Sequence, residues 1–209
     1  PHSPASSFLR NQDGTLEIDE RRSGLPENLG MIRAALFTNL DADHYPELVV
    51  AGDWMPIRIF KNRRGHYEEW DPSIRWPDHS KYSVTLKRLS DLKGLWNSLK
   101  AADFDGDGNL DLVAGNWGRN ISAQPASLGR RRLYFEETSN RATRLIEAYD
   151  RSSQEEWMPI RDWGSLGGAF PILQTKFSGF REFGQSTMEE IIARTTLKMN
   201  HKLLKLTDS

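Results

Sequence analysis

Short apolar runs that end in polar turn residues dominate the first two thirds of the chain. The runs Leu48–Gly52 and Leu112–Gly115 each follow a group of acidic residues, and Ser98–Ala102 precedes the second group. Short runs of this kind, bounded by turn residues, are typical of β-strands. The pattern therefore predicts pairs of strands joined by acidic loops.

The acidic loop at residues 103–111 has a regular arrangement of carboxylates. They occupy loop positions 1, 3, 5 and 9, as Asp103, Asp105, Asp107 and Asp111. Glycines at positions 4 and 6 let the backbone turn tightly. Carboxylates held this close repel one another unless a hard cation lies among them, and oxygen ligands suit Ca²⁺. An EF-hand would need a Glu at position 12, where the chain has Ala114, so we expect a calcium loop between two strands.

The same pattern occurs once before, in the loop at residues 39–47. The loop starts, Asn39 and Asp103, are 64 positions apart, whereas Trp54 and Trp117 are 63 apart. This difference predicts that one residue has been lost between the copies and that the two Trp residues are equivalent. The segments 8–16 and 59–67 also resemble each other and read as hairpins. A period of about 60 residues made of short strands predicts propeller blades or another repeat array.

Composition narrows the function classes. The chain has 28 basic and 29 acidic residues, so no net field favours nucleic acid or an anionic membrane. It has no Cys, which excludes disulfides and Cys-ligated zinc, and no apolar stretch long enough to span a membrane. Seven Trp and the basic residues Arg58, Lys61, Arg63 and Arg64 suggest a single-stranded nucleic-acid binder, which the balanced charge disfavours.

These motifs resemble the FG-GAP/VCBS repeats of β-propellers, through the acidic loop and the Leu-Val-Ala-Gly-Asn run that follows it. More narrowly, the segments 48–57, 96–98 and 170–173 resemble bacterial secreted proteins that combine such repeats with an ASPIC/UnbV domain. The resemblance implies a mainly β fold, a partial β-propeller with a C-terminal helical insert. We expect about three blades in residues 1–164 and a helical insert or rim segment in residues 165–209. No ASPIC/UnbV domain is recognisable, so we expect a segment of a longer chain.

The resemblance also implies a ligand set for each loop. In the regular loop, the side chains of the four aspartates and the backbone carbonyl of Asn109 would bind Ca²⁺. In the loop at residues 39–47, called the degenerate loop because it departs from the regular pattern, the corresponding residues are Asn39, Asp41, Asp43, Tyr45 and Glu47. Fewer charges and the loss of a glycine predict weaker binding there, and a polar turn closed by hydrogen bonds is the alternative.

A third copy of the loop is expected near residue 140. Its ligand positions would hold Glu136, Thr138, Asn140 and Arg144, and the sequence of residues 54–58 recurs at 157–161. Because Arg144 places a cation where a carboxylate should meet the metal, we expect no calcium there and an ion pair between Arg144 and Glu136.

The C-terminal part of the chain changes to helical periodicity. Residues 165–169 look like a hinge, and Pro171 can open a helix. Phe177, Phe180 and Phe183 form one apolar stripe that ends at Gly184. A second helix is expected to begin with a capping box from Ser186 to Glu189. Packing on the propeller rim is the simpler role for this segment, and a lid or docking arm is the alternative.

These observations favour a non-catalytic, calcium-binding β-propeller segment of a secreted or cell-surface protein. Its location would be extracellular, cell-surface or periplasmic, where calcium is abundant, and protein or glycan partners would meet a propeller face. The five His are scattered without the paired spacing of a His-ligated metal site, and neither a Cys nucleophile nor a Gly-x-Ser-x-Gly motif is present. The alternative is an accessory or catalytic module of an extracellular carbohydrate-active enzyme, which would need two carboxylates about 5–9 Å apart in an open groove.

Overall fold

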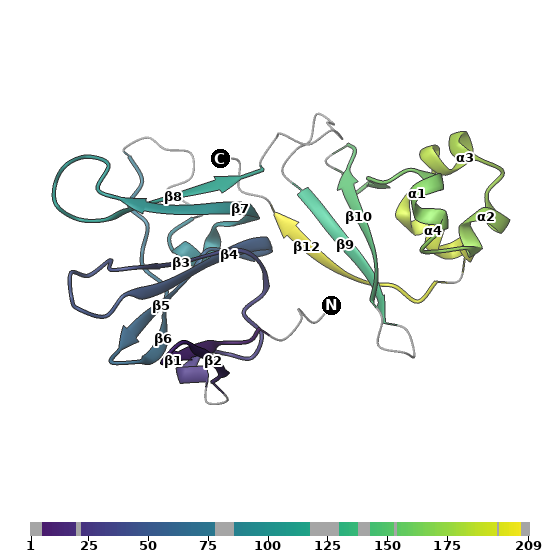
Figure 1. The fold of residues 1–209 in the computed structure, drawn as a ribbon. Coiled ribbons are helices and arrows are strands. Elements are labelled where there is room, and N and C mark those ends of the chain that lie inside the picture. The colour runs from purple at the N-terminus through teal and green to yellow at the C-terminus, as the bar shows by residue number, and fades with distance from the viewer. Residues whose placement is uncertain are drawn as a thin grey trace. The chain divides into compact units, whose positions relative to one another are not determined.

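The computed structural model describes residues 6–19, 22–77, 86–117, 130–137, 143–152, 154–195 and 197–205. The chain is mainly β and divides into two compact units, residues 2–118 and 119–208 (Figure 1). The boundary expected at residue 164 runs through the second unit. No helix among these residues is both long enough and apolar enough to cross a membrane.

The part of the first unit that the structure describes is built from antiparallel strands and two short 3₁₀ turns. The turns are η1 (Arg22–Gly24) and η2 (Leu89–Asp91), and the strands are β1 (Leu9–Gln12), β2 (Thr15–Ile18), β3 (Met31–Thr38), β4 (Glu47–Pro56), β5 (Arg58–Arg63), β6 (His66–Trp70), β7 (Lys93–Ala102) and β8 (Asp111–Asn116). Strands β3 to β6 pair in sequence order, β7 pairs with β8, and the end of β4 also pairs with the start of β7. The predicted strand pairs around both acidic loops are therefore confirmed (Figure 1).

The two strand pairs share one register. Thr38 faces Glu47 where β3 pairs with β4, and Ala102 faces Asp111 where β7 pairs with β8. Each ladder carries an irregularity at the same step, after Ile32 in β3 and after Trp96 in β7. All these positions differ by 64, and the shift stays 64 beyond the loops.

The predicted loss of one residue is therefore wrong. Gly52 faces Ile32 and Asn116 faces Trp96, so Gly52 corresponds to Asn116 and not to Gly115. Trp117 takes the place of Asp53, and its N–H donates to the Leu95 carbonyl at 3.0 Å. The prediction paired identical residue types, whereas the hydrogen-bonded strands pair residues at a constant shift of 64.

The two predicted hairpins are confirmed and have the same turn. The Gly14 N–H donates to the Asn11 side chain at 2.8 Å, and the Gly65 N–H donates to Asn62 at 2.7 Å. In both turns a residue with positive φ precedes the glycine, which is the geometry of a two-residue hairpin loop.

The sheet of the first unit has an apolar cluster on each face. One cluster includes Leu48, Val50 and Phe60, packed against Leu25 and Leu29 from the N-terminal segment. The other includes Val49, Ala51, Ile59, Trp96 and Leu99 and joins β4 and β5 to β7. Alternate residues of β4 enter opposite clusters, as the two-residue period of a strand requires.

In its described residues, the second unit combines a four-stranded antiparallel sheet with four short helices. The sheet has the order β11-β10-β9-β12, and its elements are β9 (Arg130–Glu137), β10 (Thr143–Asp150), β11 (Trp157–Pro159), α1 (Trp163–Gly167), α2 (Ile172–Lys176), α3 (Phe180–Gln185), α4 (Met188–Thr195) and β12 (Asn200–Lys205). One core joins strand residues such as Ile146 and Trp157 to helix residues such as Leu173 and Ile191. The helices therefore share their core with the sheet.

Several details of the predicted helical segment are wrong. Residues 165–167 belong to α1, because Asp162 caps that helix through the Ser165 N–H at 2.8 Å. The Phe stripe does not lie on one helix: Phe177 follows the end of α2, and only Phe180 and Phe183 lie on α3. Phe183 is buried whereas Phe180 is 65% exposed.

The capping box is formed one residue later than expected. Thr187 and Glu190 exchange hydrogen bonds between side chain and backbone, at 3.0 and 3.2 Å. The Ser186 hydroxyl instead donates to the Glu182 carbonyl at the end of the preceding helix. Farther on, the apolar residues after 199 belong to a strand, β12, because their hydrogen-bonding partner is β9.

Candidate metal sites

The regular loop brings three of its carboxylates together. Oxygens of Asp103, Asp105 and Asp111 all lie within 4.8 Å of one another. Asp103 shapes the turn, because its carboxylate accepts the N–H groups of Gly106 at 2.7 Å and Gly108 at 3.0 Å. Both glycines have positive φ, +80° and +89°, so the turn favours glycine at these two positions.

Asp107, another predicted ligand, contacts Asn109 within the loop. Its carboxylate accepts the backbone N–H of Asn109 at 2.8 Å and the side-chain amide of the same residue at 3.0 Å. These two hydrogen bonds, the backbone one first, hold the pKa of Asp107 below its usual range. Asp107 does not join the group formed by the other three aspartates.

The degenerate loop also gathers three carboxylates. Oxygens of Asp41, Asp43 and Glu47 lie within 4.8 Å of one another. The backbone contacts repeat those of the other loop: Glu47 accepts the Leu40 N–H at 2.8 Å, as Asp111 accepts the Phe104 N–H at 2.9 Å. The Tyr45 N–H donates to Asp43 at 2.6 Å, as the Asn109 N–H donates to Asp107. These two contacts persist despite the altered sequence, whereas the converging carboxylates stand at loop positions 3, 5 and 9 here and at 1, 3 and 9 in the other loop.

Burial distinguishes the two loops. Glu47 has an exposed fraction of 0%, whereas Asp103 and Asp105 are exposed and Asp111 is half-buried. The Glu47 Oε1 atom is buried without a hydrogen-bond partner, and so is the Asn39 Oδ1 atom, although the Asn39 amide donates to the Asp43 carbonyl. A buried carboxylate oxygen without a partner is costly unless a cation is close to it.

A basic side chain that sequence reasoning did not assign to this site, Lys61, contacts the degenerate loop. Its Nζ atom donates to Asp41 Oδ2 at 3.0 Å, and this bond is the main reason that the pKa of Asp41 is lowered. Lys61 comes from β5, so only the pairing of β5 with β4 brings it to the loop. The sequence of the loop itself does not indicate this contact with Lys61.

The donor sets of both loops fit a hard divalent cation. Each loop offers carboxylate oxygens on three side chains that already converge. Oxygen ligands at this density are what Ca²⁺ prefers. In loop 39–47, the two unpartnered oxygens of Asn39 and Glu47 are a second, independent indication of a cation site.

The third copy of the loop differs from the other two. Arg144 and Glu136 lie opposite each other in the β9–β10 ladder, and their side chains form an ion pair at 3.7 Å, as predicted. The other two predicted positions, Thr138 and Asn140, lie outside the described residues. The repeated segment at 157–159 forms a separate strand that pairs with β10, whereas residues 54–56 continue β4, so the two copies are not structurally equivalent.

Comparison with known proteins places a family within the first unit. The family model of the FG-GAP-like repeat matches residues 39–114, which begin at the first acidic loop and end beyond the second. Residues 39–114 therefore form an FG-GAP-like repeat, in agreement with the predicted resemblance. No curated protein and no solved structure matches the chain.

Proposed function

We propose that this chain is a calcium-stabilised, non-catalytic part of a β-propeller from a secreted or cell-surface protein. The observation that carries the proposal is the pair of loops 39–47 and 103–111, which share one strand register 64 residues apart and each bring three carboxylates together. Calcium would link the strands of each pair at their loop end.

The proposed role of calcium is structural. In each loop the clustered carboxylates come from one stretch of nine residues between two strands. An ion held in this way would offset the repulsion between carboxylates and fix the loop. The family match supports blades of the FG-GAP type, and the bacterial secreted proteins with an ASPIC/UnbV domain remain the proposed context. A protein or glycan would be the partner at a propeller face.

The observations favour binding over glycoside hydrolysis. In each loop the clustered carboxylates come from a single turn and accept hydrogen bonds from its own backbone, whereas a catalytic pair flanks an open groove. A cavity of about 290 Å³ in the first unit is lined mainly by apolar residues, among them Phe8, Leu29 and Phe37, and by no carboxylate. We therefore propose that the chain is not an enzyme.

A thermal unfolding experiment tests the calcium proposal. The protein should unfold at a higher temperature in millimolar calcium than in chelator. The Asp105→Ala variant should lose much of this gain, because it removes one of the three converging carboxylates of loop 103–111. Magnesium at the same concentration is the control, since its smaller octahedral shell suits such loops less well. An unchanged melting temperature of the unaltered protein in calcium would refute the proposal.

A further inference from the structure

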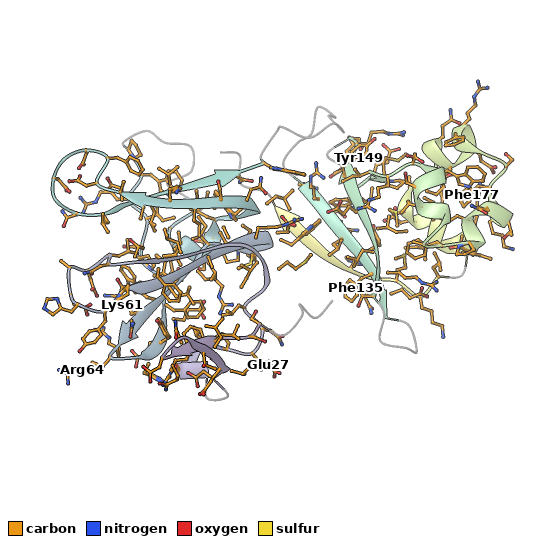
Figure 2. The ribbon with its side chains drawn as sticks, in the orientation of Figure 1. Glu27, Lys61, Arg64, Phe135, Tyr149 and Phe177 are labelled. Carbon is orange, nitrogen blue, oxygen red and sulfur yellow. The ribbon has the colours of Figure 1, made fainter. Side chains whose placement is uncertain are left out.

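Lys61, which is labelled in Figure 2, contacts a carboxylate of loop 39–47 and an aromatic ring. Its Nζ atom lies 3.0 Å from Asp41 Oδ2 and 4.4 Å from the centroid of the Trp70 ring. The side chain is only 21% exposed. An ammonium group enclosed by a carboxylate and an aromatic face is screened less by solvent than a free surface lysine. Lys61 therefore acts as a fixed positive charge at the loop.

Lys61 comes from β5, the strand that pairs with β4 next to the loop. Leu48 of β4 pairs with Phe60 of β5, so Glu47 and Lys61 occupy the next step of the two strands toward the loop. The clustered Asp41, Asp43 and Glu47 carry three formal negative charges, and the ammonium reduces the net charge to two. Before any metal ion binds, part of the negative charge of the loop is therefore already neutralised.

Lys61 nevertheless leaves ligand atoms unused. The unpartnered Oε1 of Glu47 and Oδ1 of Asn39 are both buried, and within the described segments Asp41 is the only hydrogen-bond partner of the Lys61 ammonium. A metal ion could satisfy these two atoms, whereas the tethered ammonium does not. The loop therefore combines a place for an ion with a charge that opposes it.

The other loop lacks such a charge within the part of the chain that the structure describes. No ion pair there joins a basic side chain to a carboxylate of loop 103–111. Its clustered aspartates accept hydrogen bonds from their own backbone instead. Two loops with one register thus present different electrostatic environments to a cation.

We propose that Lys61 is a built-in competitor of calcium at loop 39–47, so that the two loops load at different calcium concentrations. This inference rests on the proposed calcium function. To bind Asp41, calcium must displace the ammonium or accept its repulsion. A unit charge and a divalent ion about 5 Å apart repel enough, even in a water-like dielectric, to weaken binding about tenfold. Loop 103–111 would fill first and loop 39–47 at higher calcium.

Calcium titration calorimetry on the whole chain tests this inference. The Asp111→Asn substitution weakens loop 103–111 and isolates the binding at loop 39–47. In that background Lys61→Met removes the charge and keeps an apolar stem against Trp70, and it should tighten binding about tenfold. Lys61→Arg keeps the charge and should leave the affinity weak. Lys176→Met, an exposed charge in the second unit, controls for net charge.

The results separate the inference from the function on which it rests. An affinity of loop 39–47 that stays within twofold after Lys61→Met would overturn the inference, and so would equal tightening by Lys176→Met. If Lys61→Met unfolds the protein by circular dichroism, Lys61→Gln gives the same comparison with a polar side chain. Calcium binding at loop 103–111 in the unaltered chain tests the proposed function separately, because Lys61 does not contact that loop.

Discussion

Replacing Glu47 by Gln should stabilise the protein without calcium and weaken its response to calcium. Glu47 is fully buried, and its Oε1 has no partner. The substitution keeps an oxygen that accepts the Leu40 N–H and removes the charge. Its new amide group is a donor that can turn toward Asp41 or Asp43, whose oxygens lie within 4.8 Å of the carboxylate. The metal-free loop would then have fewer unmet hydrogen-bonding groups.

The size of the effect follows from the missing partner. A buried polar atom without a hydrogen bond costs about 1–3 kcal/mol, and more when it is charged. We therefore expect the free energy of unfolding of Glu47→Gln in chelator to exceed that of the unaltered protein by about 1–3 kcal/mol. For a unit of this size, each kcal/mol raises the melting temperature by about 4 °C.

Calcium should reverse the order of the two proteins. A ligand at 100 times its dissociation constant stabilises a fold by about 2.7 kcal/mol. The variant lacks one of the carboxylates that would bind calcium at loop 39–47, so it should lose most of this stabilisation there. Urea unfolding in chelator and in millimolar calcium measures both effects. Asp111→Asn is the matched control: it changes the same loop position, but its carboxylate is partly exposed, so no gain in chelator is expected. A Glu47→Gln protein that is less stable than the unaltered protein in chelator would refute the reasoning.

Further predictions concern the backbone and the second unit. Gly52→Ala should cost at least about 2 kcal/mol by urea unfolding, because its Cβ would lie 2.0 Å from the Met31 carbonyl oxygen. Gly184→Ala, in a helix with nothing within 4 Å of the new Cβ, should instead stabilise by about 0.5–1 kcal/mol; destabilisation would contradict the structure. Leu173→Ala should cost about 2–5 kcal/mol, since Leu173 is fully buried, and a change below 1 kcal/mol would argue against that core. Hydrogen bonds from Ser178 lower the pKa of Glu182 to about 2, so this carboxylate stabilises the fold above pH 4.5 and its contribution is lost as pH falls toward 2. Melting temperatures from pH 2 to 6 should therefore vary less in Glu182→Gln, and an unchanged profile would exclude that role.

Local pattern was enough to predict the strands around both loops. Short apolar runs and turn residues predicted the strand pairs, and the Asn and Gly residues of the hairpins predicted their turns, because these signals act over a few residues. The ion pair between Glu136 and Arg144 was also predicted, since loop positions that face each other can be counted along the chain.

Where two local signals competed, the prediction failed. Ser186 and Thr187 can both cap a helix, and Ser186 was used by the preceding helix turn. The Phe residues at 177, 180 and 183 have helical spacing, but the chain breaks before Phe180 at Gly179, whose φ is +155°. Pairing identical residue types also assigned Trp117 to the wrong equivalent position, because the spacing between the two copies is defined by the hydrogen bonds between strands.

By itself, the sequence determined the acidic loops, their strand context and their repetition, because carboxylate spacing and strand pattern are local properties of the chain. Tertiary structure decided how the two loops differ. Burial left Glu47 with an unpartnered oxygen, and the pairing of β4 with β5 brought Lys61 to Asp41 from 20 residues away. Charge density along a loop can be read from the chain, but the charges that surround it depend on which strands become neighbours.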